Sequence, residues 1–367
     1  MDFTISKEKL VTGIQTVQNA VSQKSSLPIL SNVLIEAEKG IVKMTATDLD
    51  IGISFSTEAT IETEGAITVP ARKFFDIVKA LPDGSPISVS MKKSNYVTIK
   101  SAKAQFRIIG LPKEEFPNLP VFKDQDSVSI EQKVLREMIT LTDFAISRDD
   151  TRYVLNGTLL IVKEDTIILV ATDGRRLATI EKKLGKKTLV DRAVIVPTKT
   201  TQEIKRVLGE EGDVQVKFSE NQIMFEFPSS LVISRLIEGD YPSYKKVIPE
   251  RTGSEVTVGR DDFLNATRRA SIFTEQDSMA IKFSIKKKKM VMEKETPYIG
   301  KVTEEIEVDF TGKEDIEIGF NPRYLIDVLK NLEEDEIIFE VSDPTKPGVI
   351  RRGSEYTYVV LPMQLAE

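Results

Sequence analysis

Paired carboxylates are the side chains of this sequence with the clearest potential for chemistry. Three pairs stand close together along the chain: Asp48 with Asp50, Asp149 with Asp150, and Asp261 with Asp262. Two neighbouring carboxylates can bind a metal ion or divide the acid–base work of hydrolysis. Each pair, however, falls at a predicted turn or helix start, where aspartate accepts hydrogen bonds from nearby backbone. The pattern therefore favours a structural role for all three pairs.

Cysteine and histidine are both absent from the 367 residues. The chain therefore has no disulfide framework and no thiolate nucleophile, and it lacks the commonest general base and the commonest metal ligand. No glycine-rich phosphate loop occurs in a recognised spacing. We predict that the protein is not an enzyme and has no metal site, no catalytic residues and no cofactor. A carboxylate-dependent hydrolase on a repeated scaffold stays open as an alternative.

A unit of about 125 residues recurs along the chain. Ala46-Thr47-Asp48 returns as Ala171-Thr172-Asp173 at a spacing of 125 residues, and Glu115-Phe116-Pro117 returns as Asp240-Tyr241-Pro242 at the same spacing. A third copy is fainter and lacks the Ala-Thr-Asp element. A period of this length indicates a repeated domain rather than the short repeats of a solenoid.

Each copy of the repeat contains two places where an apolar strand pattern runs into an amphipathic helix pattern. The predicted helices cover residues 6–18, 71–81, 131–144, 198–208, 260–273 and 321–332. Short strand patterns separated by turns fill most of the remainder. We therefore predict an α+β protein of three similar domains, each with two helices packed on antiparallel sheet. The expected domains are residues 1–124, 125–250 and 251–367.

Charge is distributed unevenly over these elements. The chain has a net charge of −6, whereas the six predicted helices together carry +6. A face formed by the helices could bind DNA, but Lys and Arg are also common on solvated helix faces, so the charge pattern leaves the question open. The amino terminus lacks a signal-peptide pattern, and no apolar run reaches the length of about 18 residues that a membrane span needs. We predict a cytoplasmic protein that does not contact membranes.

Several longer stretches share one resemblance. They are Leu27–Asn32, Thr45–Leu49, Phe106-Arg107, Arg152–Gly157, Ala171–Ala178, Asp240–Pro242, Ile318–Asn321 and Tyr358–Met363. In this order and at these separations they resemble the bacterial sliding clamp, the β subunit of DNA polymerase III, along essentially the whole chain. The resemblance implies the DNA clamp fold, in which two chains join head to tail as a ring and helices line the central hole.

The resemblance also implies a function and partners. A sliding clamp is a non-catalytic processivity factor that encircles double-stranded DNA, which would place this protein at the nucleoid. Its implied protein partners are a second copy of itself, the DNA polymerase III α subunit, the clamp loader δ subunit, other DNA polymerases and repair proteins, which bind through short clamp-binding peptides. A repeated β-rich scaffold that binds only proteins is the other alternative.

Three groups of site residues follow from the resemblance. The implied peptide-binding groove comprises Arg152, Leu155, Thr172, Gly174, Arg175, Arg176, Leu177, Pro242, Lys246, Val247, Asn321, Tyr324, Val359, Val360, Leu361, Pro362, Met363 and Gln364. The DNA-binding candidates, drawn from the resemblance and from basic residues of the predicted helices, are Lys24, Arg72, Lys73, Lys79, Arg152, Tyr153, Lys199, Lys205, Arg206, Arg268 and Arg269. The implied dimer interface comprises Lys100, Lys103, Phe106, Arg107, Ile272, Phe273, Glu304 and Glu305.

Overall fold

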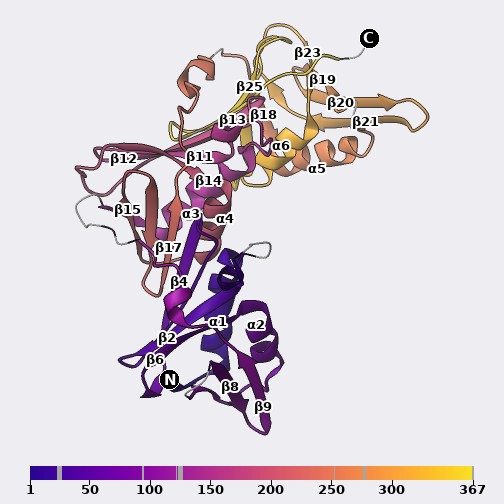
Figure 1. Ribbon diagram of the computed structural model, residues 1–367. Coiled ribbons are helices and arrows are strands. Elements are labelled where there is room, and N and C mark those ends of the chain that lie inside the picture. The colour runs from indigo at the N-terminus through magenta and orange to yellow at the C-terminus, as the bar shows by residue number, and fades with distance from the viewer. Residues whose placement is uncertain are drawn as a thin grey trace. The chain divides into compact units, whose positions relative to one another are not determined.

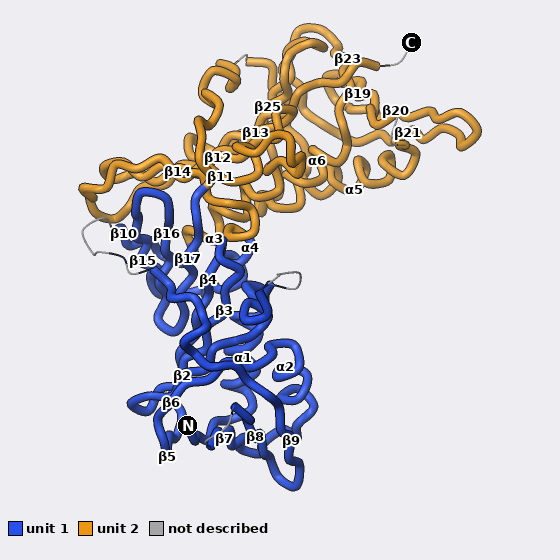
Figure 2. The backbone as a smooth tube through the Cα atoms, in the orientation of Figure 1, with its two compact units in different colours: residues 1–133, 202–236 blue, residues 134–201, 237–367 orange. Residues whose placement is uncertain are grey.

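The computed structural model describes residues 1–22, 27–92, 95–120, 122, 127–251, 253–275 and 278–365. The chain divides into two compact units, which are coloured separately in Figure 2. The first unit contains residues 1–133 and 202–236, and the second contains residues 134–201 and 237–367. Each unit is built on two antiparallel sheets.

Six α-helices lie where the sequence predicts them (Figure 1). They are α1 (Lys7–Val17), α2 (Ala71–Ala80), α3 (Gln132–Thr140), α4 (Thr198–Val207), α5 (Arg260–Ser271) and α6 (Pro322–Leu329). The largest difference is at the end of α3, which was expected to continue to residue 144. Instead Asp143–Ala145 forms the separate 3-10 turn η4.

The first unit contains a five-stranded and an eight-stranded sheet. In spatial order the five strands are β5 (Thr60–Thr63), β1 (Asp2–Ile5), β7 (Ile87–Met91), β8 (Tyr96–Ser101) and β9 (Ala104–Ile109). The eight strands are β10 (Ser127–Glu131), β15 (Asp213–Phe218), β16 (Gln222–Glu226), β17 (Ser230–Arg235), β4 (Ile51–Glu58), β3 (Ile41–Thr47), β2 (Asn32–Glu38) and β6 (Gly65–Pro70).

The second unit contains a nine-stranded and a four-stranded sheet. The nine strands, in spatial order, are β14 (Arg192–Pro197), β11 (Gly157–Lys163), β12 (Thr166–Thr172), β13 (Arg176–Lys183), β26 (Tyr356–Val360), β25 (Gly348–Arg352), β24 (Glu336–Glu340), β18 (Glu255–Gly259) and β22 (Asp309–Phe310). The four strands are β21 (Gly300–Glu307), β20 (Lys289–Thr296), β19 (Ile281–Lys286) and β23 (Ile316–Phe320).

The two largest sheets each join strands from successive copies of the repeat. In the first unit β4 of the first copy pairs with β17 of the second, from Ile51 opposite Ser234 to Phe55 opposite Ser230. In the second unit β13 of the second copy pairs with β26 of the third. By position in the repeat, β4, β13 and β21 are equivalent strands, and so are β9, β17 and β26. The same strand-to-strand seam is therefore made twice within one chain.

The helices are held by their apolar faces. In α1 the buried residues Leu10, Ile14 and Val17 follow the three-to-four-residue spacing of one helix face. In the third copy, Phe263 of α5 lies against Phe283 and Phe339, with ring centres 6.2 and 5.9 Å away. Helix α5 also lies beside α6 in the second unit (Figure 1). No helix among the described residues is long and apolar enough to cross a membrane.

The paired carboxylates have the local roles that their positions predict. Asp149 accepts hydrogen bonds from the backbone and hydroxyl of Thr151 at 3.0 and 2.7 Å. Asp261 and Asp262 lie in the first turn of α5, where acidic side chains interact favourably with the helix dipole. No cluster of three potential metal ligands occurs within the described ranges. The run Lys286–Lys289 is the tip of the hairpin between β19 and β20, as expected.

Candidate functional site

A hollow of about 160 Å³ lies in the second unit beside the β13–β26 seam. Its wall is more apolar than polar and consists of Leu155, Thr172, Gly174, Arg175, Arg176, Leu177, Pro242, Ser243, Tyr244, Val247, Val359 and Leu361. Ten of these residues belong to the groove that the sequence predicts. Ser243 and Tyr244 were missed, although the Asp-Tyr-Pro element beside them marked the segment. We call this hollow the apolar pocket.

The turn from Thr172 to Arg176 shapes one side of the apolar pocket. The Thr172 hydroxyl donates to the Arg176 carbonyl at 2.6 Å and accepts from the Gly174 amide at 3.0 Å. One carboxylate oxygen of Asp173 accepts from the amides of Arg175 and Arg176 at 2.9 and 3.0 Å. Gly174 has a φ of +83°, a conformation that costs little only for glycine. The Ala-Thr-Asp element thus encodes a complete local turn.

Arg152 closes the turn from outside the apolar pocket. Its guanidinium donates to the Asp173 carbonyl at 2.9 Å. A Cβ atom on Gly174 would stand 2.3 Å from the Arg152 Nη1 atom. Glycine at position 174 therefore serves two purposes, because it permits the positive φ and leaves room for the arginine. Arg152 itself is not part of the wall of the hollow.

The tail of the chain forms the opposite side of the apolar pocket. Strand β26 pairs with β13 from Tyr356 opposite Ile180 to Val360 opposite Arg176. Beyond the strand, the Leu361 amide donates to the Arg175 carbonyl at 2.9 Å, and the Met363 amide donates to the Gly319 carbonyl at 2.8 Å. The structure thus brings the end of the third copy against the second copy, as the grouping of predicted groove residues required.

Arg176 is the charged centre beneath the apolar pocket. Its side chain is 9% exposed and forms ion pairs with Asp173 at 3.0 Å and Asp327 at 2.7 Å. It also donates to the Phe144 carbonyl at 2.6 Å, and its guanidinium lies 4.5 Å from the centre of the Tyr324 ring. Because its hydrogen bonds are directed into the protein, Arg176 fixes the pocket and offers little charge to a ligand.

Burial favours the neutral form of two tyrosines near the apolar pocket. Burial raises the pKa of Tyr241, whose hydroxyl donates to the Val170 carbonyl at 3.4 Å. Burial also raises the pKa of Tyr244. A neutral wall of leucine, valine, proline and tyrosine suits an apolar side chain of a ligand, with a few backbone and side-chain groups available as polar anchors.

The other predicted groove residues are not part of the wall of the apolar pocket. Asn321 caps α6 by accepting from the Arg323 amide at 3.0 Å, and Tyr324 stacks on Arg176. Val360 is fully buried. Lys246 belongs to the 3-10 turn η6 (Tyr244–Val247). Pro362, Met363 and Gln364 continue along the tail, and the last two line a second cavity.

The predicted DNA-binding residues fall mainly on three helices. Arg72, Lys73 and Lys79 lie on α2, Lys199, Lys205 and Arg206 lie on α4, and Arg268 and Arg269 lie on α5. Tyr153, in the 3-10 turn η5 (Tyr153–Leu155), is 60% exposed. Lys24 lies outside the described residues. Their contact with DNA stays a prediction.

The predicted dimer residues lie on two strands and at one helix end. Lys100 is on β8 and Phe106 and Arg107 are on β9, with Lys103 in the turn between these strands. Ile272, 74% exposed, and Phe273 follow the end of α5. Two acidic residues of β21 have partners within the chain. Glu304 forms a bidentate ion pair with Arg269, and Glu305 forms an ion pair with Lys289 at 2.8 Å. Their expected pairing with Lys100, Lys103 and Arg107 across a dimer stays untested.

Known proteins match the chain over its whole length. The family descriptions that match are DNA polymerase III beta subunit, N-terminal domain (residues 1–120), central domain (129–243) and C-terminal domain (245–364). The beta sliding clamp of Bacillus subtilis is 33% identical over 372 residues, with 98% of each protein covered. That of Vibrio cholerae is 32% identical over 371 residues, with all of both proteins covered.

Solved structures agree with the sequence matches. The sliding clamp of Bacillus subtilis superposes with a TM-score of 0.94 at 32% identity, covering all of both chains. The sliding clamp of Bartonella birtlesii bound to griselimycin also has a TM-score of 0.94, at 35% identity and full coverage of both chains. The resemblance and the three-domain clamp fold expected from the sequence are both confirmed. The chain belongs to the DNA polymerase III beta subunit family, the bacterial sliding clamps.

Proposed function

We propose that this protein is the sliding clamp of its replication machinery. Two copies form a ring around duplex DNA, and the ring holds the replicative polymerase, the clamp loader and repair proteins through short peptides bound in the groove. The protein itself is non-catalytic. The match to sliding clamps over the whole chain carries this proposal. It acts in the cytoplasm, at the nucleoid.

The strand seams support the ring. Within one chain, the seam that joins successive copies is made between β4 and β17 and again between β13 and β26. The equivalent strands left over are β21 of the third copy and β9 of the first, and each is at the edge of its sheet among the described strands. If β21 of one protomer pairs with β9 of its partner, the same seam occurs twice more and the ring closes head to tail.

The side chains near these two edges suit such a contact. Phe106 on β9 is 37% exposed, and Ile272 at the end of α5 is 74% exposed. Exposed strand edges are prone to pair with another chain, and clustered apolar side chains favour the burial that pairing brings. We therefore propose that the strands and the apolar residues form the interface. Glu304 and Glu305 already form ion pairs within the chain. We therefore expect electrostatic attraction to contribute less to the interface than apolar contact does.

The basic helices support a loose hold on DNA. Helix α2 exposes Arg72, Lys73 and Lys79, and α5 exposes Arg268 and Arg269. Contacts with phosphates are independent of sequence and weaken with salt, which suits a protein that slides. A clamp also raises the local concentration of the polymerase at the primer end, so processivity needs no new chemistry.

The apolar pocket supports the peptide-binding role. Leu177 and Val359 are buried in its wall, while Val247 and Leu361 remain 54% and 41% exposed, and an apolar side chain of a peptide would cover them. We propose that the occupants are Leu- and Phe-containing segments of the DNA polymerase III α subunit, the clamp loader δ subunit, and other polymerases and repair proteins.

Primer extension on circular single-stranded DNA tests the function. With the cognate polymerase and clamp loader, this protein should lengthen the products made in one binding event. A protein-only scaffold or a carboxylate-dependent hydrolase would leave product length unchanged. A variant with Leu177 and Val247 replaced by alanine serves as the matched control, because it should form rings but fail to hold the polymerase.

A further inference from the structure

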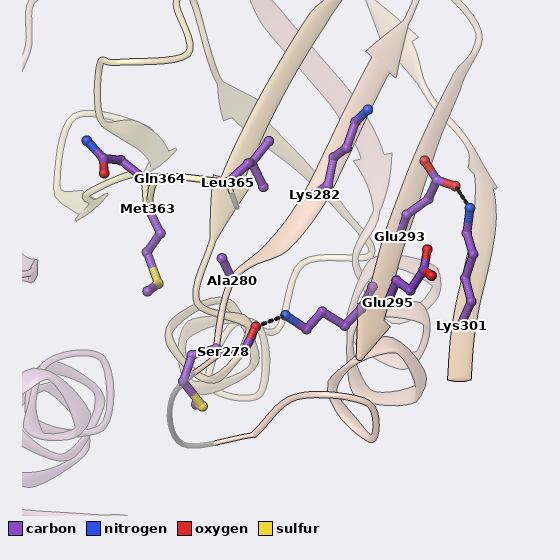
Figure 3. Close-up of a pocket in the computed structure, with 11 residues that line it drawn as sticks. Ser278, Ala280, Lys282, Glu293, Glu295, Lys301, Met363, Gln364 and Leu365 are labelled. Atoms are coloured by element: carbon purple, nitrogen blue, oxygen red, sulfur yellow. Dashed lines mark hydrogen bonds and ion pairs between the residues drawn. The ribbon is translucent and has the colours of Figure 1, made fainter. Parts of the chain in front are cut away.

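A second cavity, of about 360 Å³, lies in the third copy of the repeat beside the chain's tail (Figure 3). Its walls come from the segment before β19, the facing parts of β19, β20 and β21, and the tail beyond β26. Ser278, Lys282, Glu293, Lys294, Lys301 and Met363 are among the residues that line it. We call this space the tail cavity.

Lys294 is the unusual residue of the tail cavity. Met290, Met292 and Lys294 follow one another at every second position of β20, so their side chains begin on the same buried face of the sheet. Lys294 is 7% exposed. Its ammonium donates to the Ser278 hydroxyl at 2.5 Å. Burial lowers the pKa of Lys294, and the more distant charge of Glu275 only partly opposes this.

The ammonium of Lys294 lacks a carboxylate partner within the described part of the chain. No carboxylate there approaches it to the 4.0 Å of an ion pair. An ammonium has three N–H donors, and one neutral hydroxyl accepts only one of them. A buried cation that is neither fully hydrated nor paired gains strongly from a carboxylate brought beside it.

The other two lysines of the tail cavity are already paired. Lys282 forms an ion pair with Glu317 at 2.8 Å, and Lys301 forms one with Glu293 at 2.9 Å. The remaining lining carboxylate, Glu295, is exposed, where water and salt screen its charge. An incoming anion therefore finds one lysine whose charge is not balanced by an ion pair, Lys294.

The tail joins the tail cavity to the apolar pocket. Leu361 lines the pocket and Met363, two residues further on, lines the cavity. The hydrogen bonds from Leu361 to Arg175 and from Met363 to Gly319 hold this stretch in place. At about 3.3 Å per residue in an extended chain, the two positions are about 7 Å apart. An extended peptide anchored in the pocket reaches the cavity within a few residues.

We propose that the tail cavity is an acid-accepting extension of the peptide groove. An Asp or Glu that flanks the apolar residues of a docked peptide enters the cavity, and its carboxylate accepts hydrogen bonds from the Lys294 ammonium. This inference rests on the proposed peptide-binding function, and it adds a preference for charge at a defined place beside the apolar motif.

Fluorescence anisotropy with paired peptides tests the inference. The probes are labelled peptides with a fixed Leu/Phe core and one Asp placed in turn at each of five positions on either side. Each has a partner peptide with Asn at the same position. On the wild-type protein we expect one Asp position to bind about fivefold or more tightly than its Asn partner, the size of a well-placed ion pair. On Lys294→Met the two should bind equally.

Lys282→Met is the matched control. It removes a lysine from the same tail cavity whose charge Glu317 already balances, so the preference for Asp should persist. Thermal melting should show that Lys294→Met folds, because an apolar side chain of similar length replaces a buried cation.

Three results would overturn the inference. One is equal binding of Asp and Asn peptides at every position on the wild type, which leaves peptide binding itself intact. Another is a preference for Asp over Asn that persists in Lys294→Met, or that Lys282→Met loses to the same extent as Lys294→Met. If none of the peptides binds the wild type, the proposed peptide-binding function fails, and the inference fails with it.

Discussion

At the scale of single residues, the same turn occurs in the first and second copies of the repeat. Thr47 and Asp48 bond the backbone of residues 49–51 just as Thr172 and Asp173 bond residues 174–176, with Asp48 accepting from Ile51 at 2.9 Å. The residues with positive φ match as well, at +81° for Leu49 and +83° for Gly174. At Gly174 the Arg152 guanidinium also lies against the turn, so this glycine serves the site as well as the fold.

Arg176→Met tests the charged centre beneath the apolar pocket. The change leaves the carboxylates of Asp173 and Asp327 without their shared partner in a largely buried place, so we expect stability to fall by about 3 kcal/mol. A shift of the urea denaturation midpoint to lower concentration would record the loss. Arg175→Met is the control, because its side chain is exposed and should alter peptide binding without moving the midpoint. Equal midpoints for both variants would contradict the role given to Arg176.

At the scale of elements, the β13–β26 seam builds the groove. It places the end of the third copy beside the Ala-Thr-Asp turn of the second, so Leu177 and Val359 meet in one wall although 182 residues separate them. Six more residues of tail then follow Leu361, and one backbone hydrogen bond ties Met363 to Gly319. The tail is therefore an attachment to the groove and only a small part of the fold.

Deletion of residues 362–367 tests the role of the tail. Melting should change little, because one backbone hydrogen bond contributes about 1 kcal/mol. Binding of a Gln/Leu/Phe-containing polymerase peptide should weaken sharply, because the chain after Leu361 is removed together with its Met363–Gly319 hydrogen bond, and the tail cavity loses a wall. Fluorescence anisotropy measures the peptide affinity, and light scattering should show the same oligomeric state as the full chain. A truncated protein that binds the peptide as well as the full chain would show that the groove is misplaced.

At the scale of the whole molecule, the repeat leaves one seam unmade at each end. The edges of β9 and β21 are the counterparts of strands that pair elsewhere in the chain, and in the ring that we propose a second copy pairs with each of them. Closure by a partner would bury large apolar side chains such as Ile272, which is 74% exposed in the single chain.

Replacing Ile272 and Phe273 by alanine tests the dimer. The variant loses apolar surface that the interface would bury, a loss on the order of several kcal/mol over the two contacts of a ring. Light scattering at low micromolar concentration should show monomers where the wild type shows dimers. Ile338→Ala, which removes an exposed isoleucine on β24, a strand of a different sheet from β9 and β21, should stay dimeric. A fully dimeric double variant would rule out this interface.

Retention on DNA of different shapes tests encirclement. The net charge of +6 over the six predicted helices is too small for tight static binding, so the ring should stay on DNA by topology. Clamps loaded on nicked circular DNA should persist through gel filtration and leave once a restriction enzyme linearises the circle. Equal retention on circular and linear DNA would mean that contacts and not enclosure hold the protein.

Local patterns in the sequence were sufficient to predict the helices and turns. All six helices appear where apolar spacing predicts them, because a helix needs only one apolar face and suitable ends within a dozen residues. The turn at Asp173 was predictable for the same reason, since its hydrogen bonds join residues at most four apart. Most of the groove lining followed from the family resemblance, which already contains the long-range arrangement.

Only the tertiary structure decided which distant residues meet. The seams between copies, the Arg176–Asp327 ion pair and the entry of Tyr244 into the apolar pocket all join segments far apart in sequence. Lys294 shows most clearly what the sequence does not determine. Its two-residue spacing from Met290 and Met292 could have indicated that it lies on the buried face of the sheet. No sequence pattern indicates that Lys294 lines a cavity, or that its ammonium has no carboxylate partner among the described residues. Contacts of this kind depend on how whole sheets and the tail pack, and no local pattern encodes them.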